Sequence, residues 1–101
     1  QEVIKIKNYV GTSINANLFR GIEAVGGKIH FSDNSLIFKS HELNIQKGKT
    51  EIKYKDIESI SKRNTLGIVP NGIKIVLKNG VEHNFVVNNR KKIINFLNLQ
   101  K

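Results

Sequence analysis

The segment from Gly26 to Lys39, with the sequence GGKIHFSDNSLIFK, constrains the fold more than any other part of the chain. Apolar and polar residues alternate on both sides of Asp33-Asn34, two residue types that tolerate the positive φ of a tight hairpin turn. A two-residue loop there sets two apolar pairs opposite each other: Phe31 with Leu36, and Ile29 with Phe38. The other face is expected to carry Lys28, Ser32 and Ser35. A slip of one residue would expose the apolar side chains to water, so the pattern predicts one register.

A second hairpin is predicted around Asn79-Gly80. A two-residue turn at these residues would place Leu77 opposite Glu82, which breaks the apolar ladder. A three-residue loop over 78–80 instead gives three matched pairs: Leu77 with Val81, Ile75 with His83, and Ile73 with Phe85. The ladder therefore predicts a type I turn followed by a bulge, in which Gly80 has a positive φ.

The rest of the chain is predicted to hold further short strands and a closing helix. The strands are expected at 3–10, continuing towards Ala16, at 51–54 and at 57–62. The connections are expected at 18–25, 40–49 and 64–72. Near the C-terminus, Asn88 or Asn89 is expected to cap a helix. Its buried stripe is formed by Ile93, Ile94, Phe96 and Leu97, at helical spacing.

Composition limits the class of protein. A chain of 101 residues predicts one domain, covering 1–101, and 39% hydrophobic residues with one proline exclude a disordered or fibrous protein. No apolar run is long enough to span a bilayer, and no signal-peptide pattern opens the sequence. The absence of cysteine excludes disulfides and thiolate metal sites, which fits a reducing compartment. Because the first residue is Gln1, we expect the start of the natural chain to be missing.

The charge is strongly positive. Seventeen Lys and Arg residues against eight Asp and Glu residues give a net charge of +9. This excess favours anionic partners such as nucleic acid, an acidic membrane or an acidic protein. A lysine-rich surface that only keeps the protein soluble explains the same numbers. The same two alternatives hold for Arg90, Lys91 and Lys92 in the first helical turn, which are either a solvated basic turn or an anion contact.

Two segments resemble the GRAM domain family. The first is GGKIHFSDNSLIF, and the second is residues 56–97, with a short strand, a Gly-Pro connection, a hairpin and the helix. The resemblance covers Ile14 to Leu97 and is greatest to the small stand-alone GRAM-like proteins of bacteria. It implies a mostly β, pleckstrin-homology-like barrel of about seven antiparallel strands in two nearly orthogonal sheets, capped by a C-terminal helix. It also implies a binding module, since eukaryotic relatives are associated with phosphoinositides, other acidic lipids and protein contacts.

Catalytic chemistry has little support in the sequence. The three histidines, at 30, 41 and 83, do not have the spacing of a metal-binding helix. The acids show no paired arrangement suited to acid–base catalysis, and Gly26-Gly27 is explained by a turn rather than by a phosphate loop. We therefore predict no enzyme, no cofactor and no metal site.

Basic loops are the better candidates for function. If the barrel is right, its loops gather one set of cations at the open end: Arg20, Lys39, Lys47, Lys49 and Lys78. We expect them to attach the domain to acidic lipid headgroups, as a cytoplasmic protein held at the inner face of the membrane. Dispersed lysines with no common target are the alternative.

Two further classes of partner remain. Leu66, Ile68 and Val69 form an apolar run that either packs back onto the sheet or marks a partner or membrane-insertion site. A protein-interaction module, receiving a peptide at this run or at a sheet edge, is thus the main alternative to lipid binding. Nucleic acid is disfavoured, because single-strand binding needs exposed rings. Only Phe19, Tyr9 and Tyr54 are expected to be exposed.

Overall fold

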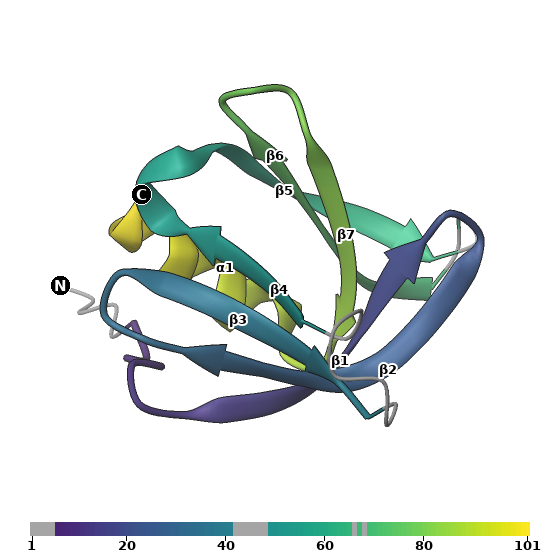
Figure 1. Cartoon of the computed structure of the whole chain (residues 1–101), viewed down its shortest axis with the longest axis horizontal. Helices are drawn as coiled ribbons and strands as arrows, with labels where there is room; N and C mark the ends of the chain where they lie inside the picture. Colours follow the sequence, from purple (N-terminus) through teal and green to yellow (C-terminus); the bar gives the residue numbers. More distant parts are fainter. Residues whose placement is uncertain (1–5, 42–48, 66, 68) are drawn as a thin grey trace, which may run out of the picture.

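The computed structural model describes residues 6–41, 49–65, 67 and 69–101. In these residues seven antiparallel strands form a curled half-barrel, and one α-helix lies against its open side (Figure 1). The elements are β1 (Ser13–Arg20), β2 (Glu23–Phe31), β3 (Ser35–Ser40), β4 (Lys49–Lys53), the 3₁₀ turn η1 (Tyr54–Asp56), β5 (Ile57–Thr65), β6 (Val69–Leu77), β7 (Glu82–Val87) and α1 (Arg90–Gln100). The predicted fold class is confirmed. Within the described residues no helix combines the length and apolar content needed to cross a bilayer.

The two expected sheets are parts of one continuous sheet with the order β4-β3-β2-β1-β7-β6-β5. Its seam is narrow, because β1 and β7 are joined by three residue pairs, from Ala16 with Val87 to Leu18 with Phe85. The strands on the two sides of the seam cross at a steep angle (Figure 1). The short seam therefore lets one sheet curl round the core like two.

The first hairpin has the predicted register, with Ile29 opposite Phe38 and Phe31 opposite Leu36. Its turn is built differently, since neither Asp33 nor Asn34 has a positive φ. Ser32 holds it instead: its Oγ accepts the N–H of Ser35 at 3.0 Å, and its own N–H donates to the Ser35 carbonyl at 2.8 Å. Ser35 lies on the outer face as expected but is only 2% exposed. A serine turn therefore replaces the predicted positive-φ turn.

The second hairpin is confirmed in register and turn type. Ile73 lies opposite Phe85 and Ile75 opposite His83. The Leu77 N–H donates to the Val81 carbonyl at 2.8 Å, and the Leu77 carbonyl accepts the Gly80 N–H at 2.9 Å. Gly80 has a φ of +89°, which only glycine adopts easily.

The first strand was predicted at 3–10, continuing towards Ala16. Residues 3–5 lie outside the described residues, and 6–12 form no strand, so the prediction was wrong for that part. The first strand of the described chain is β1, so the expected connection at 18–25 is the end of one strand, a turn at Gly21-Ile22 and the start of the next. Gly21 makes this turn with a φ of +63°. Tyr9, expected in a strand, lies in a non-strand segment and is 3% exposed. The segment before β1 therefore covers the core.

The connection expected at 64–72 is also shorter than predicted. β5 continues to Thr65 and β6 begins at Val69, so most of this stretch is paired. Pro70 lies where the β5–β6 register shifts, between the pairs Arg63–Gly72 and Thr65–Val69. A proline lacks the N–H that a regular ladder needs, so the irregular pairing accommodates it. Most of the loop expected at 40–49 lies outside the described residues.

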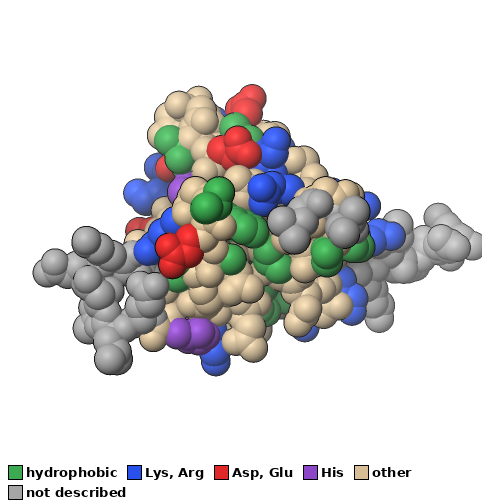
Figure 2. All heavy atoms as spheres, turned by 90° about the vertical axis from the view of Figure 1, so that its right-hand side faces the viewer, with side chains coloured by type: hydrophobic (Ala, Val, Ile, Leu, Met, Phe, Trp, Pro, Cys, Tyr) green, Lys and Arg blue, Asp and Glu red, His purple; other side chains and the backbone are tan. Residues whose placement is uncertain are grey.

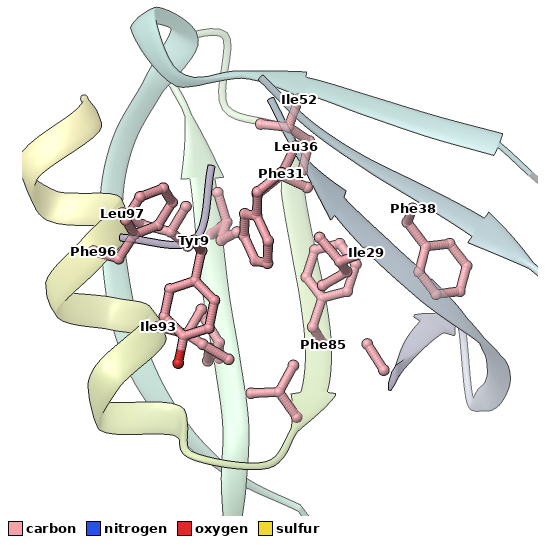
Figure 3. Close-up of a cluster of buried hydrophobic side chains, with 14 of the residues drawn as sticks. Tyr9, Ile29, Phe31, Leu36, Phe38, Ile52, Phe85, Ile93, Phe96 and Leu97 are labelled. Carbon is pink, nitrogen blue, oxygen red and sulfur yellow. The ribbon is translucent and has the colours of Figure 1, made fainter. Parts of the chain in front are cut away.

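An aromatic cluster joins the helix to the sheet (Figure 3). The ring of Phe96 lies 5.4 Å from that of Tyr9, 5.5 Å from that of Phe31 and 6.2 Å from that of Tyr54. The predicted helical stripe is confirmed, since Ile93, Ile94, Phe96 and Leu97 are all buried. The helix thus covers the side of the core that the sheet leaves open.

The start of the helix corrects one detail. Asn89 is the residue before α1, but its side chain caps no N–H group. Its backbone is left-handed instead, with a φ of +57°, and its carbonyl accepts the Lys92 N–H at 3.0 Å. Asparagine is favoured here because it tolerates this conformation, not because it caps.

Phe96→Ala should lower the free energy of unfolding by about 3–5 kcal/mol, because it removes the ring that three other aromatic residues contact. Chemical denaturation measures this loss. Leu99→Ala, on the same helix but 64% exposed, is the control and should cost under about 0.5 kcal/mol. Equal losses in the two variants would contradict the central place given to Phe96.

Tyr54→Phe should lower stability by about 1 kcal/mol at neutral pH, because the Tyr54 hydroxyl donates to the Ser32 carbonyl at 2.8 Å. Burial, with a smaller effect of Asp33, raises the pKa of Tyr54 from 10.0 to about 12. Between these values the unfolded chain loses the phenol proton while the folded chain keeps it, so the wild type loses stability as pH rises. Urea unfolding at several pH values should show the difference between wild type and variant shrinking from pH 10 to 12. A constant difference would refute this account.

Candidate functional site

The titratable groups do not converge on a catalytic centre in the part of the chain that the structure describes. No group of three His, Cys, Asp or Glu residues there could hold a metal ion. His83 faces the side chains of β6 and is half-buried, and this burial lowers its pKa. His83 is therefore neutral at physiological pH and adds nothing to the positive field.

Three lysines lie side by side on the outer face of the sheet. Lys28 of β2 is directly opposite Lys39 of β3, and Lys39 is directly opposite Lys49 of β4. All three side chains are exposed. They point away from the core, because the residues that alternate with them, such as Ile29 and Phe38, are buried. We call Lys28, Lys39 and Lys49 the lysine row.

The lysine row concentrates charge at a cost. Directly opposite residues of an antiparallel pair have Cβ atoms about 5 Å apart, and like charges at this spacing destabilise a sheet. No carboxylate of a described residue forms an ion pair with any of the three. An anion bound across the row would relieve this repulsion.

One acid lies beside the row on the same outer face. Glu51 is two residues after Lys49 on β4, and its Oε2 accepts a hydrogen bond from the Ser35 Oγ at 3.0 Å. Glu51 is thus engaged with the serine turn, and the next residue on this face, Lys53, is again basic and exposed. The field over β2, β3 and β4 therefore stays positive.

The structure brings together only part of the predicted basic set. Lys39 and Lys49 are direct partners, while Lys47 lies outside the described residues. Lys78 is in the β6–β7 turn, where its N–H donates to the Asp56 carbonyl. Asp56 follows the end of β4, whereas Lys49 is at the start of that strand, so Lys78 and Lys49 lie apart. Arg20 ends β1 and lies two residues after the buried Leu18, so both are on the inner face of the sheet. Arg20 therefore does not extend the row.

Lys28 was not predicted as a site residue, because the candidate cations were chosen by their position in the expected loops. The signal was present in the hairpin register, which already set Lys28 opposite Lys39. A cross-strand neighbour contributes to a charged surface as much as a loop residue does.

Arg90 has neither of the two roles expected for the basic helical turn. Its Nη1 donates to the Arg63 carbonyl at 3.2 Å and the Asn64 Oδ1 at 3.3 Å, and lies 3.5 Å from the Gly72 carbonyl. Arg90 therefore fastens the start of α1 to β5 and β6. Lys91 and Lys92 remain exposed, as expected for a solvated turn.

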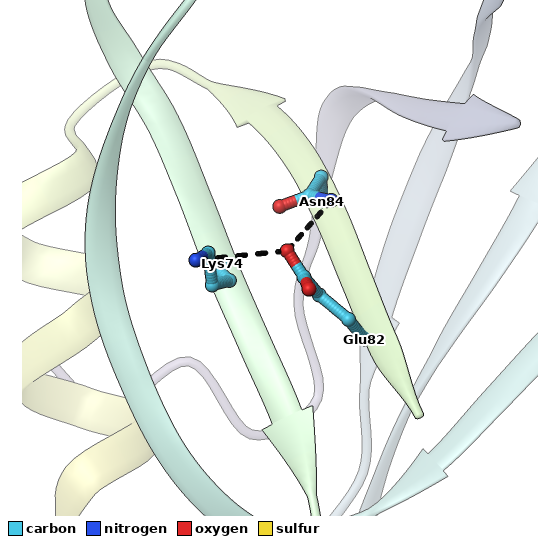
Figure 4. A network of polar contacts seen from close by, with 3 residues as sticks. All are labelled: Lys74, Glu82 and Asn84. Atoms are coloured by element: carbon cyan, nitrogen blue, oxygen red, sulfur yellow. Dashed lines mark hydrogen bonds and ion pairs between the residues drawn. The ribbon is translucent and has the colours of Figure 1, made fainter. Parts of the chain in front are cut away.

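Lys74 forms an ion pair with an acidic side chain. Its Nζ lies 3.7 Å from Glu82 Oε1, which also accepts a hydrogen bond from Asn84 Nδ2 at 3.3 Å (Figure 4). The ion pair is the only one between described residues. The outer face of β6 and β7 thus differs from that of β2 to β4, where the lysines pair with no acid of the described ranges.

Exposed apolar side chains form a second feature. Val69 of the predicted apolar run is 41% exposed, and Leu66 and Ile68 lie outside the described residues. Ile22, at the tip of the β1–β2 hairpin, is fully exposed at 102%. Figure 2 shows the side of the molecule where this hairpin ends, with hydrophobic side chains exposed among basic and acidic ones. Ile22 was missed because its neighbours were taken for a connection.

The rings expected to be exposed are covered. Tyr9 and Tyr54 are 3% and 2% exposed, so that expectation was wrong for both. Phe19 is half-buried, and the Arg63 guanidinium lies 5.0 Å from its ring centre. The described surface therefore offers no row of free aromatic rings on which bases could stack.

Comparison with known proteins places the fold. The GRAM domain family matches residues 3–98 of this chain. A solved structure, the C-terminal domain of an unknown protein from Leishmania infantum, has a TM-score of 0.76 and 20% sequence identity; the match covers 90% of this chain and 82% of that one. No curated protein sequence matches. Because the family match spans nearly the whole chain, this protein belongs to the GRAM domain family.

Proposed function

We propose that this chain is a non-enzymatic binding module, of the small bacterial type, that attaches to acidic lipid headgroups through the lysine row. GRAM domains are generally binding modules of the pleckstrin-homology-like class. The observation that carries the proposal is the alignment of Lys28, Lys39 and Lys49 on one outer face without an acid partner among the described residues. In this proposal Lys39 and Lys49 act as expected, and Lys47, which lies outside the described residues, is included for its place in the sequence two residues before Lys49.

The proposed attachment is weak, peripheral and sensitive to salt. Each basic residue near an acidic membrane contributes about 1 kcal/mol, and the effect falls off within a Debye length. Three lysines on one face supply about 3 kcal/mol together. Arg20 and Lys78 would add only long-range attraction, because they lie on other faces of the molecule. Such a module works at the acidic cytoplasmic surface of a membrane, without inserting a helix.

Replacing the lysine row by Lys28→Gln, Lys39→Gln and Lys49→Gln should weaken binding to acidic vesicles by on the order of 100-fold at low salt. The reason is the loss of three cations from one surface. Co-sedimentation with vesicles of phosphatidylcholine, with and without phosphatidylglycerol, at low and physiological salt, measures this change.

The matched control makes the same charge change elsewhere. Lys62, Lys91 and Lys92 are also exposed, on β5 and α1, so their triple glutamine variant lowers the net charge equally. It should keep most of the binding. If both variants lose binding equally, net charge and not the row is responsible, and equal binding of the wild type to neutral and acidic vesicles would reject the proposal.

A second candidate function is a protein-interaction module. The observation that favours it is the exposure of Ile22, at 102%, and of Val69, at 41%, on a domain of this size. Exposed apolar side chains on neighbouring turns are typical of partner contacts. Leu66 and Ile68 lie outside the described residues and are included in this proposal for their place in the sequence between β5 and β6.

The double variant Ile22→Ser and Val69→Ser separates the two functions. Both side chains are exposed, so stability should change by no more than about 0.5 kcal/mol. If a protein partner binds this surface, a stoichiometric partner co-purified from the native host should be lost from this variant and kept by the lysine-row variant. Loss of vesicle binding in the serine variant would instead assign the apolar surface to the membrane.

A further inference from the structure

A hollow of about 260 Å³, lined by both polar and apolar residues, lies beside the lysine row, between β1, β2 and β7. Three asparagine amides and one imidazole line it. The residues that matter here are Asn15, Asn17, Gly26, His41, Val86 and Asn88. Asn15 lies directly opposite Lys28 across the β1–β2 pair, so the hollow borders the row. We call this feature the asparagine hollow.

Gly26 forms the floor of the asparagine hollow. Asn17 lies opposite Gly26 on one side, and on the other the His41 N–H donates to the Gly26 carbonyl at 3.0 Å. A Cβ atom at Gly26 would lie 3.2 Å from Asn17 Oδ1 and 3.8 Å from His41 Cδ2. The hollow therefore exists because one position of the outer face carries no side chain.

Backbone strain does not explain this glycine, and a Cβ atom there would crowd only one side-chain atom, Asn17 Oδ1. Gly26 has no positive φ, so any residue fits its backbone conformation. Its neighbour Gly27 is different, because a Cβ atom there would lie 2.2 Å from the Lys39 carbonyl oxygen. Gly27 is required by the close approach of the β2 and β3 backbones, whereas a side chain at Gly26 would require only the Asn17 side chain to shift. An unfilled, amide-lined space suits a small polar ligand.

The residues that line the hollow indicate the chemical class of its ligand. Each asparagine amide offers two donor hydrogens and an acceptor oxygen, which matches vicinal hydroxyl groups. No side-chain hydrogen bond joins Asn15, Asn17 or Asn88 to another described residue, so these amides are available. The adjoining ammonium groups of Lys28 and Lys39 suit a phosphate. The volume lies below the range for drug-sized ligands, so a small polyol fits better than a large ring.

We infer that the asparagine hollow binds a short phosphorylated polyol of the glycerol phosphate type. The hydroxyl groups form hydrogen bonds with the amides of Asn15, Asn17 and Asn88, and the phosphate lies over Lys28 and Lys39. A lipid headgroup and soluble glycerol phosphate both present this chemistry. For the lipid source the inference rests on the proposed function, because the lysine row then supplies the membrane contact.

Glycerol 1-phosphate is the probe, and the side-chain amide signals of a ¹⁵N-labelled full chain report its binding. Signals of Asn15, Asn17 and Asn88 should shift with glycerol phosphate at concentrations about tenfold below those needed with inorganic phosphate. Gly26→Val, which fills the floor and keeps the charge, should weaken this binding by about tenfold or more. Ala24→Val makes a comparable change two residues away on the same exposed face and should bind like the wild type.

A second pair of variants covers the case in which Gly26→Val does not fold. Asn88→Asp places a carboxylate in the hollow and should also weaken binding of glycerol phosphate about tenfold, whereas Asn98→Asp, exposed on α1, should not. Equal affinity of the wild type for glycerol phosphate and inorganic phosphate overturns the inference. Unchanged affinity in both hollow variants overturns it as well.

Vesicles separate this inference from the proposed function. Phosphatidylglycerol and phosphatidylserine carry the same net charge, but only the former presents a glycerol phosphate headgroup. A wild-type preference for phosphatidylglycerol that Gly26→Val abolishes supports the hollow as a headgroup site. Equal binding to both lipids, unchanged in Gly26→Val and without binding of the soluble probe, overturns the hollow and leaves the lysine row intact. Binding of the soluble probe without vesicle binding supports the hollow and assigns it a soluble ligand.

Discussion

The contact of Phe96 with three other aromatic rings is the interaction on which the fold depends. Tyr9, Phe31 and Tyr54 come from the N-terminal segment, β2 and η1, so one helical side chain ties three distant parts of the chain together. A half-barrel sheet leaves its core open on one side, and α1 closes that side. Two contacts hold it against β5: Arg90 at the Arg63 carbonyl and Lys101 at the Glu58 carbonyl. The inner face of the sheet is thereby filled.

Local sequence patterns predicted the elements whose partners are close in the chain. The two hairpins were predicted in the correct register because an apolar ladder and a short loop determine both strands at once. The helix was predicted because its apolar stripe has a period that no strand shares. The predictions failed where pairing partners are distant. The bounds of β1 depend on its pairing with β2 and β7. Val69 is a strand residue only because it pairs with Thr65, where the β5–β6 register is irregular.

The candidate site shows the same limit more strongly. Lys39 and Lys49 were identified as cations, but their alignment with Lys28 depends on the registers of two strand pairs, one of them between strands that are far apart in the sequence. Arg20 and Lys78 were grouped with them because loop position was used in place of strand orientation. Asn89 shows a related ambiguity: asparagine before a helix serves as a cap or as a left-handed residue, and only the structure distinguishes these roles.

The filled interior directs function to the outer face of the sheet. Two neighbouring glycines of β2 lie on opposite faces of the sheet. Gly27, on the inner face, is needed so that β2 and β3 can approach, whereas at Gly26, on the outer face, a side chain would crowd only Asn17 Oδ1. The lysine row costs stability that a different choice of side chains would avoid. The hollow and the lysine row lie side by side on β1, β2 and β3, and the proposed binding accounts for both.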